Sequence, residues 1–356
     1  MAVGAEASGH PPRRVVVVDD NRTIRALLRA LIGADPRLDC VGEAADPYEA
    51  REVIKATNPD VLTLDVEMPK MNGLKFLENL MRLRPMPVVM VSSRTTDNSA
   101  AAIEAMALGA IDCVSVMHLQ GSPEKQAALV ETLVTAANAT VQTARAVWAE
   151  PARAMPVTGY DWDGRIVAIG SSTGGVEAIE TVLRSFPADG PPVLIAQHMP
   201  PKFIQSLVER LDARLAPDIR VVDAREKLQR GTVYFGPGGE YHIGLSPRDP
   251  ETVCRVPADG TESYVPEVNI LFRSALPHAR RILGVVLSGM GRDGADGLLA
   301  LRTAGARTIV QDGATAVIDG MPKSARDLGA AETVLPLGKI GDAALARCSV
   351  GGGVRA

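Results

Sequence analysis

Aromatic residues and cysteines are scarce in this sequence. Only 3% of the 356 residues are aromatic, which leaves little for the stacking platforms that bind nucleic-acid bases or carbohydrates. The cysteines are isolated from one another, which excludes paired-cysteine zinc sites and offers no disulfide framework. We therefore expect a protein of the reducing cytoplasm. The four cysteines are Cys40, Cys113, Cys254 and Cys348.

The chain also lacks a strong net charge and a long apolar run. Lys and Arg total 38 against 42 Asp and Glu, so the formal net charge of −4 provides no overall positive field for nucleic acid. No stretch approaches the roughly 20 apolar residues of a membrane span, and the first dozen residues lack the apolar segment of a signal peptide. We expect neither a nucleic-acid partner nor direct membrane insertion.

What is present is a repeated alternation of strand and helix patterns. The chain is too long for one ordinary hydrophobic core, so we expect two domains. Five β-α steps run from a β-branched strand at Val15–Val18 to a helix near Glu124–Arg145, which predicts a flavodoxin-like parallel sheet. The intervening strands are expected at Leu38–Glu43, Val61–Leu64, Val88–Val91 and Cys113–Ser115, and the intervening helices after Asp20, from Asp46-Pro47, near Leu74–Leu83 and near Ser99–Leu108.

A second α/β alternation follows an irregular segment. Prolines and glycines break both periods between Ala146 and Gly164, which predicts a linker. From Arg165 to about Leu345 the pattern predicts a doubly wound, mostly parallel sheet, interrupted at residues 231–264 by three strand-like segments that we expect to form hairpins: Thr232–Phe235, Tyr241–Leu245 and Thr252–Val256. The expected division is a disordered terminus at 1–12, domains at 13–130 and 165–346, a helix extension and linker at 131–164, and a tail at 347–356.

Three carboxylates are expected to meet in the first domain. Asp19 and Asp20 end its first strand and Asp65 ends its third, and the carboxyl ends of parallel strands share one edge. Like charges placed so close need a cation, and hard oxygen ligands with room for water and a phosphate suit Mg²⁺. The simpler reading, solvated acids at strand ends, is less favoured for three residues with this spacing.

The same region resembles a two-component receiver domain, the phosphorylated module of response regulators. The resemblance rests on Asp19-Asp20, on Asp65 followed by Met68-Pro69-x-Met71-Asn72-Gly73, on Ser92 and on Gly109-Ala110. It implies that Asp65 accepts a phosphoryl group from a histidine kinase. It also implies that Asp19, Asp20 and Asp65 hold Mg²⁺ and that Ser92 contacts the phosphoryl oxygens.

One segment departs from the receiver pattern. Where that family carries a lysine followed by proline, this chain has Val116-Met117, and Cys113 occupies the usual aromatic position. The cation for the phosphoryl group and the switch residue are thus both replaced. We expect Asp65 to be phosphorylated still, because the acids remain, with a weak or differently wired coupling to the second domain.

A serine, a histidine and an aspartate each close a strand of the second domain. Ser171 and Ser172 follow the first strand, His198 follows the second, and Asp293 follows a later one. A serine hydroxyl needs a base and a pocket of N–H donors to act as a nucleophile, and the glycine-rich turn supplies such donors. Residue types and spacing leave both serines open as the nucleophile.

Two phosphate-binding interpretations of the turn Gly170–Gly175 are less favoured than a turn that carries a nucleophilic serine. A dinucleotide site predicts an acid at the end of the next strand, but that strand ends at Gln197-His198. A P-loop is excluded because the turn lacks the Gly-Lys-Ser/Thr ending. A DNA-binding regulator is disfavoured because no helix-turn-helix pattern with a basic face follows the linker.

Residues 165–345 resemble the catalytic domain of the chemotaxis receptor methylesterase (CheB) family. The resemblance rests on Gly170-x-Ser-Thr-Gly-Gly175, Gln197-His198-Met199-Pro200 and Ser288-Gly-Met-Gly-Arg-Asp-Gly294 in this order. It implies that Ser172 is the nucleophile, His198 the base and Asp293 the residue that orients it. It also implies that the Met290 amide stabilises the oxyanion, that Thr173 assists the histidine, and that the ester chemistry needs no cofactor.

Together the two resemblances imply a response regulator that is a hydrolase of the chemotaxis system. Such an enzyme removes methyl esters from glutamates, and deamidates glutamines, on the cytoplasmic domains of chemoreceptors, under control of a chemotaxis histidine kinase that phosphorylates its receiver. The alternative is a receiver-regulated binding module whose esterase domain is inactive.

Overall fold

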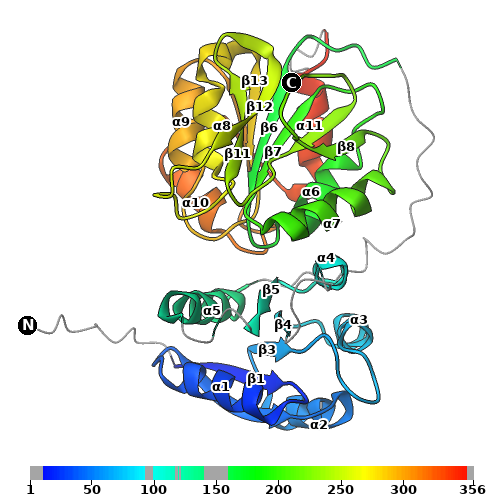
Figure 1. Ribbon diagram of the computed structural model, residues 1–356, viewed down its shortest axis with the longest axis vertical. Helices are drawn as coiled ribbons and strands as arrows, with labels where there is room; N and C mark the ends of the chain where they lie inside the picture. The colour runs from blue at the N-terminus through cyan, green and yellow to red at the C-terminus, as the bar shows by residue number, and fades with distance from the viewer. Residues whose placement is uncertain (1–10, 93–98, 117–118, 120–121, 140–158, 351–356) are drawn as a thin grey trace, which may run out of the picture. The chain divides into compact units, whose positions relative to one another are not determined.

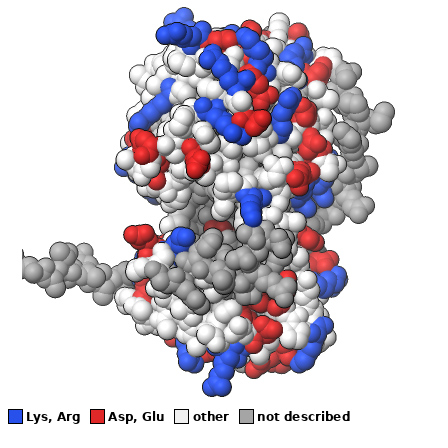
Figure 2. Space-filling model, viewed as in Figure 1, with Lys and Arg blue, Asp and Glu red and all other residues white. Residues whose placement is uncertain are grey.

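The computed structural model describes residues 11–92, 99–116, 119, 122–139 and 159–350 (Figure 1). The chain divides into two compact units, residues 1–95 with 110–139 and residues 96–109 with 140–356. Helix α4 (Ser99–Ala107) therefore belongs to the second unit. None of the helices in the described ranges is long and apolar enough to cross a bilayer. On the face shown in Figure 2, acidic and basic side chains are interspersed over each unit.

The first unit is a five-stranded sheet in the order β2-β1-β3-β4-β5, with every strand pair parallel. Val15–Val18 in β1 are buried, as expected for a strand covered on both faces. Helix α2 begins where the sequence predicts, because the Asp46 carboxylate accepts the amide hydrogens of Tyr48 and Glu49. The strands are β1 (Arg13–Val18), β2 (Leu38–Ala44), β3 (Val61–Leu64), β4 (Val88–Ser92) and β5 (Asp112–Ser115), and the helices are α1 (Arg22–Gly33), α2 (Pro47–Thr57), α3 (Gly73–Leu83) and α5 (Pro123–Ala136).

The second unit is built on a seven-stranded parallel sheet in the order β15-β14-β13-β6-β7-β10-β8. A small antiparallel sheet, β11-β12-β9, lies beside it. The strands are β6 (Ile166–Ser171), β7 (Val193–Gln197), β8 (Asp218–Val221), β9 (Arg225–Lys227), β10 (Thr232–Phe235), β11 (Tyr241–Ser246), β12 (Asp249–Pro257), β13 (Ile282–Val286), β14 (Arg307–Gln311) and β15 (Thr333–Leu335). The helices are α6 (Gly175–Leu183), α7 (Pro201–Asp212), α8 (Val268–Ser274), the 3₁₀ helix η3 (Leu276–Arg281), α9 (Ala295–Thr303), α10 (Gly320–Asp327) and α11 (Leu337–Arg347).

Both faces of this sheet are covered, and its strands alternate between two apolar cores. In β6, Val167 and Ile169 pack with α6, α7 and α11, whereas Ile166 and Ala168 pack with α8, α9 and α10. Strand β6 comes first in the sequence, and its neighbours β7 and β13 lie on opposite sides of it. The strand order thus reverses at β6, and ligands bind at such a point beyond the carboxyl ends of the strands. The predicted fold class is confirmed.

Two expected elements are corrected by the structure. Helix α5 ends at Ala136, earlier than expected: the Asn138 side-chain amide donates to the Val134 carbonyl just beyond this end, and residues 140–145 of the expected helix lie outside the described residues. Strand β10 is not part of a hairpin: it pairs in parallel with β7 and β8. All four of its residues are buried, as in a central strand. The expected hairpin does form between β11 and β12.

Of the segment expected as a linker, 146–164, residues 146–158 lie outside the described part of the chain. The remainder packs on the second unit: the Tyr160 hydroxyl donates to the Leu345 carbonyl at 2.6 Å, and the Asp163 amide donates to the Cys348 carbonyl at 2.9 Å. Within the expected tail, Cys348 is fully buried, and residues 351–356 lie outside the described part.

Candidate active site and acid cluster

Three strand ends meet at the reversal point in the second unit. The backbone amide of His198, after β7, donates to the Ser171 carbonyl at 3.1 Å. The amide of Ser172, after β6, donates to the Ser288 carbonyl after β13 at 3.0 Å. These bonds fix the segments that carry the predicted serine, histidine and aspartate beside one another.

The two candidate serines have different surroundings. Ser171 is completely buried, and its hydroxyl donates to Oε1 of Gln197 at 2.6 Å. The Gln197 amide in turn donates to the Ser172 carbonyl at 2.9 Å. The Ser171 proton is therefore engaged in holding the turn, whereas Ser172 is 8% exposed and follows the end of the strand. The geometry favours Ser172 as the nucleophile.

His198 and Asp293 form a nearly buried pair. Nε2 of His198 lies 2.7 Å from Oδ2 of Asp293, and the two side chains are 5% and 9% exposed. The same carboxylate accepts the amide hydrogens of Val268 at 2.7 Å and Asn269 at 2.9 Å. Burial opposes ionisation of Asp293, but the hydrogen bonds from His198 and these amides outweigh it and lower its pKa.

This pairing decides which nitrogen of the His198 ring is free to accept a proton. An ionised carboxylate only accepts hydrogen bonds, so Nε2 of His198 carries the proton in the neutral ring and Nδ1 is the free acceptor. Nδ1 is buried and has no hydrogen-bond partner within the described part of the chain. A buried acceptor without a partner is costly in a purely structural role, and a proton from a serine hydroxyl would satisfy it.

The turn between β6 and α6 is shaped for anions. Gly174 has a left-handed φ of 77° and precedes α6, whose first amides have no partner within the helix. A Cβ at Gly175 would lie 2.1 Å from Oε1 of Gln197, so glycine is needed for the close approach. Thr173 lies in this turn, and its carbonyl accepts from the Ser288 hydroxyl at 2.9 Å. Met290 lies in the loop after β13, next to Gly291 with a φ of 81°.

One neighbour of His198 gave no signal in the sequence. The ring of Tyr264 stacks on that of His198, with the centroids 4.2 Å apart and the planes inclined by 6°. The two residues are 66 positions apart, and Tyr264 lies in a loop without a periodic pattern. Only the fold brings them together.

The first unit brings the predicted acids into one cluster. One oxygen each from Asp19, Asp20 and Asp65 lies within 4.8 Å of the others. Burial, followed by repulsion from neighbouring carboxylates, raises the pKa of Asp65 to about 7, and burial is also the main cause that raises the pKa of Asp19 to about 6. The cluster resists carrying its full negative charge without a cation.

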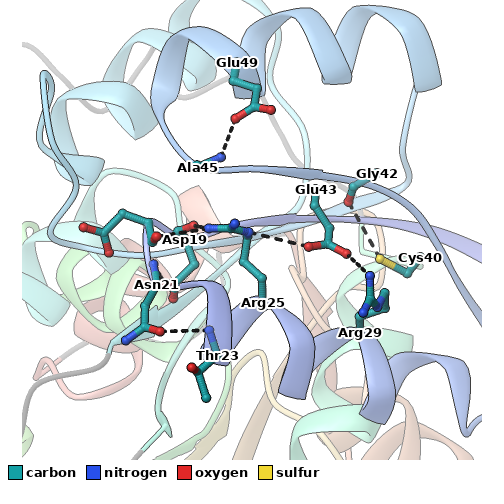
Figure 3. A network of polar contacts seen from close by, with 11 residues as sticks. Asp19, Asn21, Thr23, Arg25, Arg29, Cys40, Gly42, Glu43, Ala45 and Glu49 are labelled. Carbon is teal, nitrogen blue, oxygen red and sulfur yellow. Dashed lines mark hydrogen bonds and ion pairs between the residues drawn. The ribbon is translucent and has the colours of Figure 1, made fainter.

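The surroundings of the cluster fit a metal ion. Oδ1 of Asp19 accepts the Asn21 amide at 2.8 Å, but its buried Oδ2 has no hydrogen-bond partner in the described ranges. The Arg25 side chain donates to the backbone carbonyls of Asp19 and Asp20 and pairs with Glu43, and its charge lowers the pKa of Asp19 by less than burial raises it (Figure 3). An orphaned carboxylate oxygen among hard oxygen donors suits Mg²⁺.

The remaining receiver positions are only partly described. Ser92 ends β4, and its side chain lies outside the described residues, as does Met117. Val116 is buried. Cys113, in β5, has its pKa raised to about 12 by burial and by the charges of Asp112 and Asp65.

Comparisons with known proteins cover nearly the whole chain. The family model for the CheB methylesterase matches residues 167–344, and that for the response regulator receiver domain matches residues 15–116. A protein-glutamate methylesterase/protein-glutamine glutaminase from Agrobacterium fabrum is 46% identical over 92% of this chain and 95% of its own. A relative of the same description (numbered 1) from Caulobacter vibrioides is also 46% identical, over 93% and 97%. The crystal structure of the Thermotoga maritima CheB methylesterase catalytic domain is 33% identical, covers 51% of this chain and 98% of its own, and gives a TM-score of 0.49.

Proposed function

The chain belongs to the CheB methylesterase family, with a receiver domain at its N-terminus, and from this premise we propose that Ser172, His198 and Asp293 carry the hydrolysis. The reaction is hydrolysis of γ-methyl esters of glutamate side chains on chemoreceptors, which serves chemotaxis adaptation. Its relatives are also named glutaminases, so glutamine side chains are substrates as well. The proposed location is the cytoplasm, where the receptor domains that carry these side chains lie.

The mechanism proceeds through an acyl-enzyme. Oγ of Ser172 attacks the γ-carbonyl carbon while Nδ1 of His198 takes the hydroxyl proton, and Asp293 stabilises the imidazolium. The carbonyl oxygen becomes an oxyanion that backbone amides of the turn and of Met290 stabilise, with Thr173 supporting the histidine. His198 returns the proton to the departing methoxide, and methanol leaves. Water, activated by the same nitrogen, then releases glutamate and free Ser172. An amide substrate loses ammonia instead.

The observation that carries this proposal is the state of the His198 ring. One nitrogen is tied to an ionised carboxylate at 2.7 Å, and the other is buried and unpartnered in the described structure, next to the strand end that carries Ser172. A ring nitrogen free to accept is what a general base needs, and the Ser172 hydroxyl, which makes no hydrogen bond to it in the described structure, would turn toward it when substrate binds. Protein groups supply every step, so the proposed ester chemistry draws on no cofactor.

We further propose that Asp65 receives the phosphoryl group from a chemotaxis histidine kinase. Asp19, Asp20 and Asp65 would hold Mg²⁺, which supplies positive charge against the three phosphoryl oxygens. The Asp65 carboxylate attacks the phosphorus atom of the kinase's phosphohistidine, the P–N bond breaks and the histidine leaves, and the Ser92 hydroxyl donates to a phosphoryl oxygen. Because Val116 and Met117 replace the usual lysine and proline, the signal to the esterase does not pass through those side chains.

Covalent trapping tests the proposed nucleophile and substrate together. A phosphonyl fluoride should add one phosphonyl group to the peptide that contains both serines, and fragmentation should locate it on Ser172. Ser171→Ala should still be labelled and Ser172→Ala should not. Membranes with methylated chemoreceptors should slow the labelling, and membranes without receptors should not. Absence of labelling in the wild-type protein would favour a binding module with an inactive esterase domain.

A further inference from the structure

The base of the proposed site is covered on one ring face by a residue with no assigned role. Tyr264 is 44% exposed, whereas the His198 side chain that it covers is only 5% exposed. The parallel stack at 4.2 Å fixes the plane of the imidazole. The hydrogen bond to Asp293 holds one edge of the ring but does not by itself stop the ring from tilting about that contact.

The segment that carries Tyr264 is held by a fully buried histidine. Nδ1 of His242 accepts the backbone amide of Glu267 at 2.8 Å, so the ring proton is on Nε2, which lies 3.0 Å from Oε1 of Glu262. The Glu262 carboxylate also accepts the amides of Asp259 at 3.0 Å and Gly260 at 2.9 Å. Thus Glu262 closes the loop just before Tyr264, and His242 holds it on both sides of that residue.

The same segment is also attached to the catalytic carboxylate. Val268 and Asn269 donate their amides to Asp293, whose Oδ2 faces Nε2 of His198. Asp293 therefore holds both the Nε2 edge of the His198 ring and the end of the segment that carries Tyr264. These contacts place Tyr264 and His198 in one rigid arrangement.

We propose that Tyr264 is a positioning residue for His198, held in place by the contact between His242 and Glu262. The inference rests on the proposed role of His198 as the general base. A proton acceptor works only when it points at the proton it removes, and a small misplacement can cost about 100-fold in rate. Tyr264 acts through the face of its ring, and its hydroxyl is not required.

Substitution of the ring separates stacking from hydroxyl chemistry. Tyr264→Ala should lower kcat for methanol release by about 10- to 100-fold. KM should change less than about twofold, since positioning acts on the chemical step. Tyr264→Phe keeps the stack and should stay within about twofold of the wild type in kcat. A kcat for Tyr264→Ala equal to that of the wild type, or equal losses for Phe and Ala, would overturn the proposal.

A double-mutant cycle tests how the loop contributes. Glu262→Ala should also lower kcat, because it releases the loop that carries Tyr264. The variant with both Tyr264→Ala and Glu262→Ala should be no slower than Tyr264→Ala alone, because the two residues act through one stack. Losses that multiply would show that Glu262 acts independently of Tyr264 and would contradict the linkage.

Thermal unfolding and the wild-type control keep the outcomes distinct. Tyr264 is partly exposed, so Tyr264→Ala should unfold within a few degrees of the wild type, and a folded but slow variant supports the proposal. If the wild-type protein itself releases no methanol from methylated receptors, the proposed function fails. If the wild type is active and only the Tyr264 variants depart from expectation, the positioning role alone fails.

Discussion

Asp293 has two structural tasks because its oxygens face different partners. Oδ2 binds His198 and the Val268 amide, and Oδ1 binds the Asn269 amide. Asp293→Asn keeps only one of the two oxygens, so at least one of these donors loses its acceptor, and His198 no longer faces an ionised group. By analogy with another serine triad, kcat should fall about 10⁴-fold. Steady-state methanol release should show this loss, and thermal unfolding should show a folded protein that is less stable by about 1–3 kcal/mol, the cost of one buried donor without an acceptor. An activity within tenfold of the wild type would contradict the role of Asp293.

Burial makes the thiols of two cysteines poor nucleophiles. Burial raises the pKa of Cys113 and that of Cys348 to about 12, so both stay protonated at pH 8. Because only the thiolate is alkylated, iodoacetamide should leave both unlabelled in the native protein and should label both in denaturant. Peptide mass spectrometry measures the fraction of each cysteine that is alkylated. Rapid native labelling of either cysteine at pH 8 would show that its surroundings are more open than described.

The sequence could predict contacts that follow from strand ends, but not contacts made by loops. His198 follows β7 and Asp293 follows β13, the two strands that flank β6, so their meeting at one sheet edge was predictable from the fold class. The choice between Ser171 and Ser172 depended on a resemblance, and the structure adds the hydrogen bond from Ser171 to Gln197 as a physical reason. The stack of Tyr264 on His198 depends on a loop whose path no periodicity encodes.

At the scale of elements, the turn from β6 into α6 controls where Ser172 points. In Gly174→Ala, a Cβ would lie 2.7 Å from both Oγ of Ser288 and Cβ of Val317, in a left-handed conformation that costs alanine roughly 1–2 kcal/mol. We expect at least that loss in the free energy of unfolding measured in urea, together with lower esterase activity.

The matched control is Gly338→Ala, in the first turn of α11. Nothing lies within 4 Å of its Cβ position, and the residue is exposed. Alanine is the better helix former, so stability should be unchanged or should rise by less than about 1 kcal/mol. Equal effects of the two substitutions would contradict the account of the turn.

The elements that were predicted well are those with strong local signals. Val61–Leu64 is a short buried run of apolar and β-branched residues, and β3 has these bounds. The helical pattern continues beyond the end of α5, where the Asn138 side chain donates to the Val134 carbonyl, a contact that periodicity does not report. Strand β10 was assigned to a hairpin because turn-rich neighbours surround it, whereas burial on both sides draws it into the main sheet.

At the scale of the whole molecule, the acid cluster should make the stability of the protein depend on Mg²⁺. A ligand that binds only the folded state at 100 times its Kd stabilises it by about 2.7 kcal/mol. Mg²⁺ should therefore raise the unfolding temperature of the part of the chain that contains Asp65, as scanning calorimetry of the full chain would record. Asp65→Asn removes one ligand charge and should reduce this shift. An equal shift in both proteins would contradict the assigned site.

The central claim is that one chain couples an esterase at Ser172 to phosphorylation at Asp65. The measurement that tests it most directly is methanol release from methyl-labelled chemoreceptor membranes, with and without acetyl phosphate and Mg²⁺. Wild type and Asp65→Asn should both release methanol, and only the wild type should accelerate with the phosphodonor. Ser172→Ala should release none in either condition. Methanol release by Ser172→Ala, or equal responses of wild type and Asp65→Asn to the phosphodonor, would contradict the account.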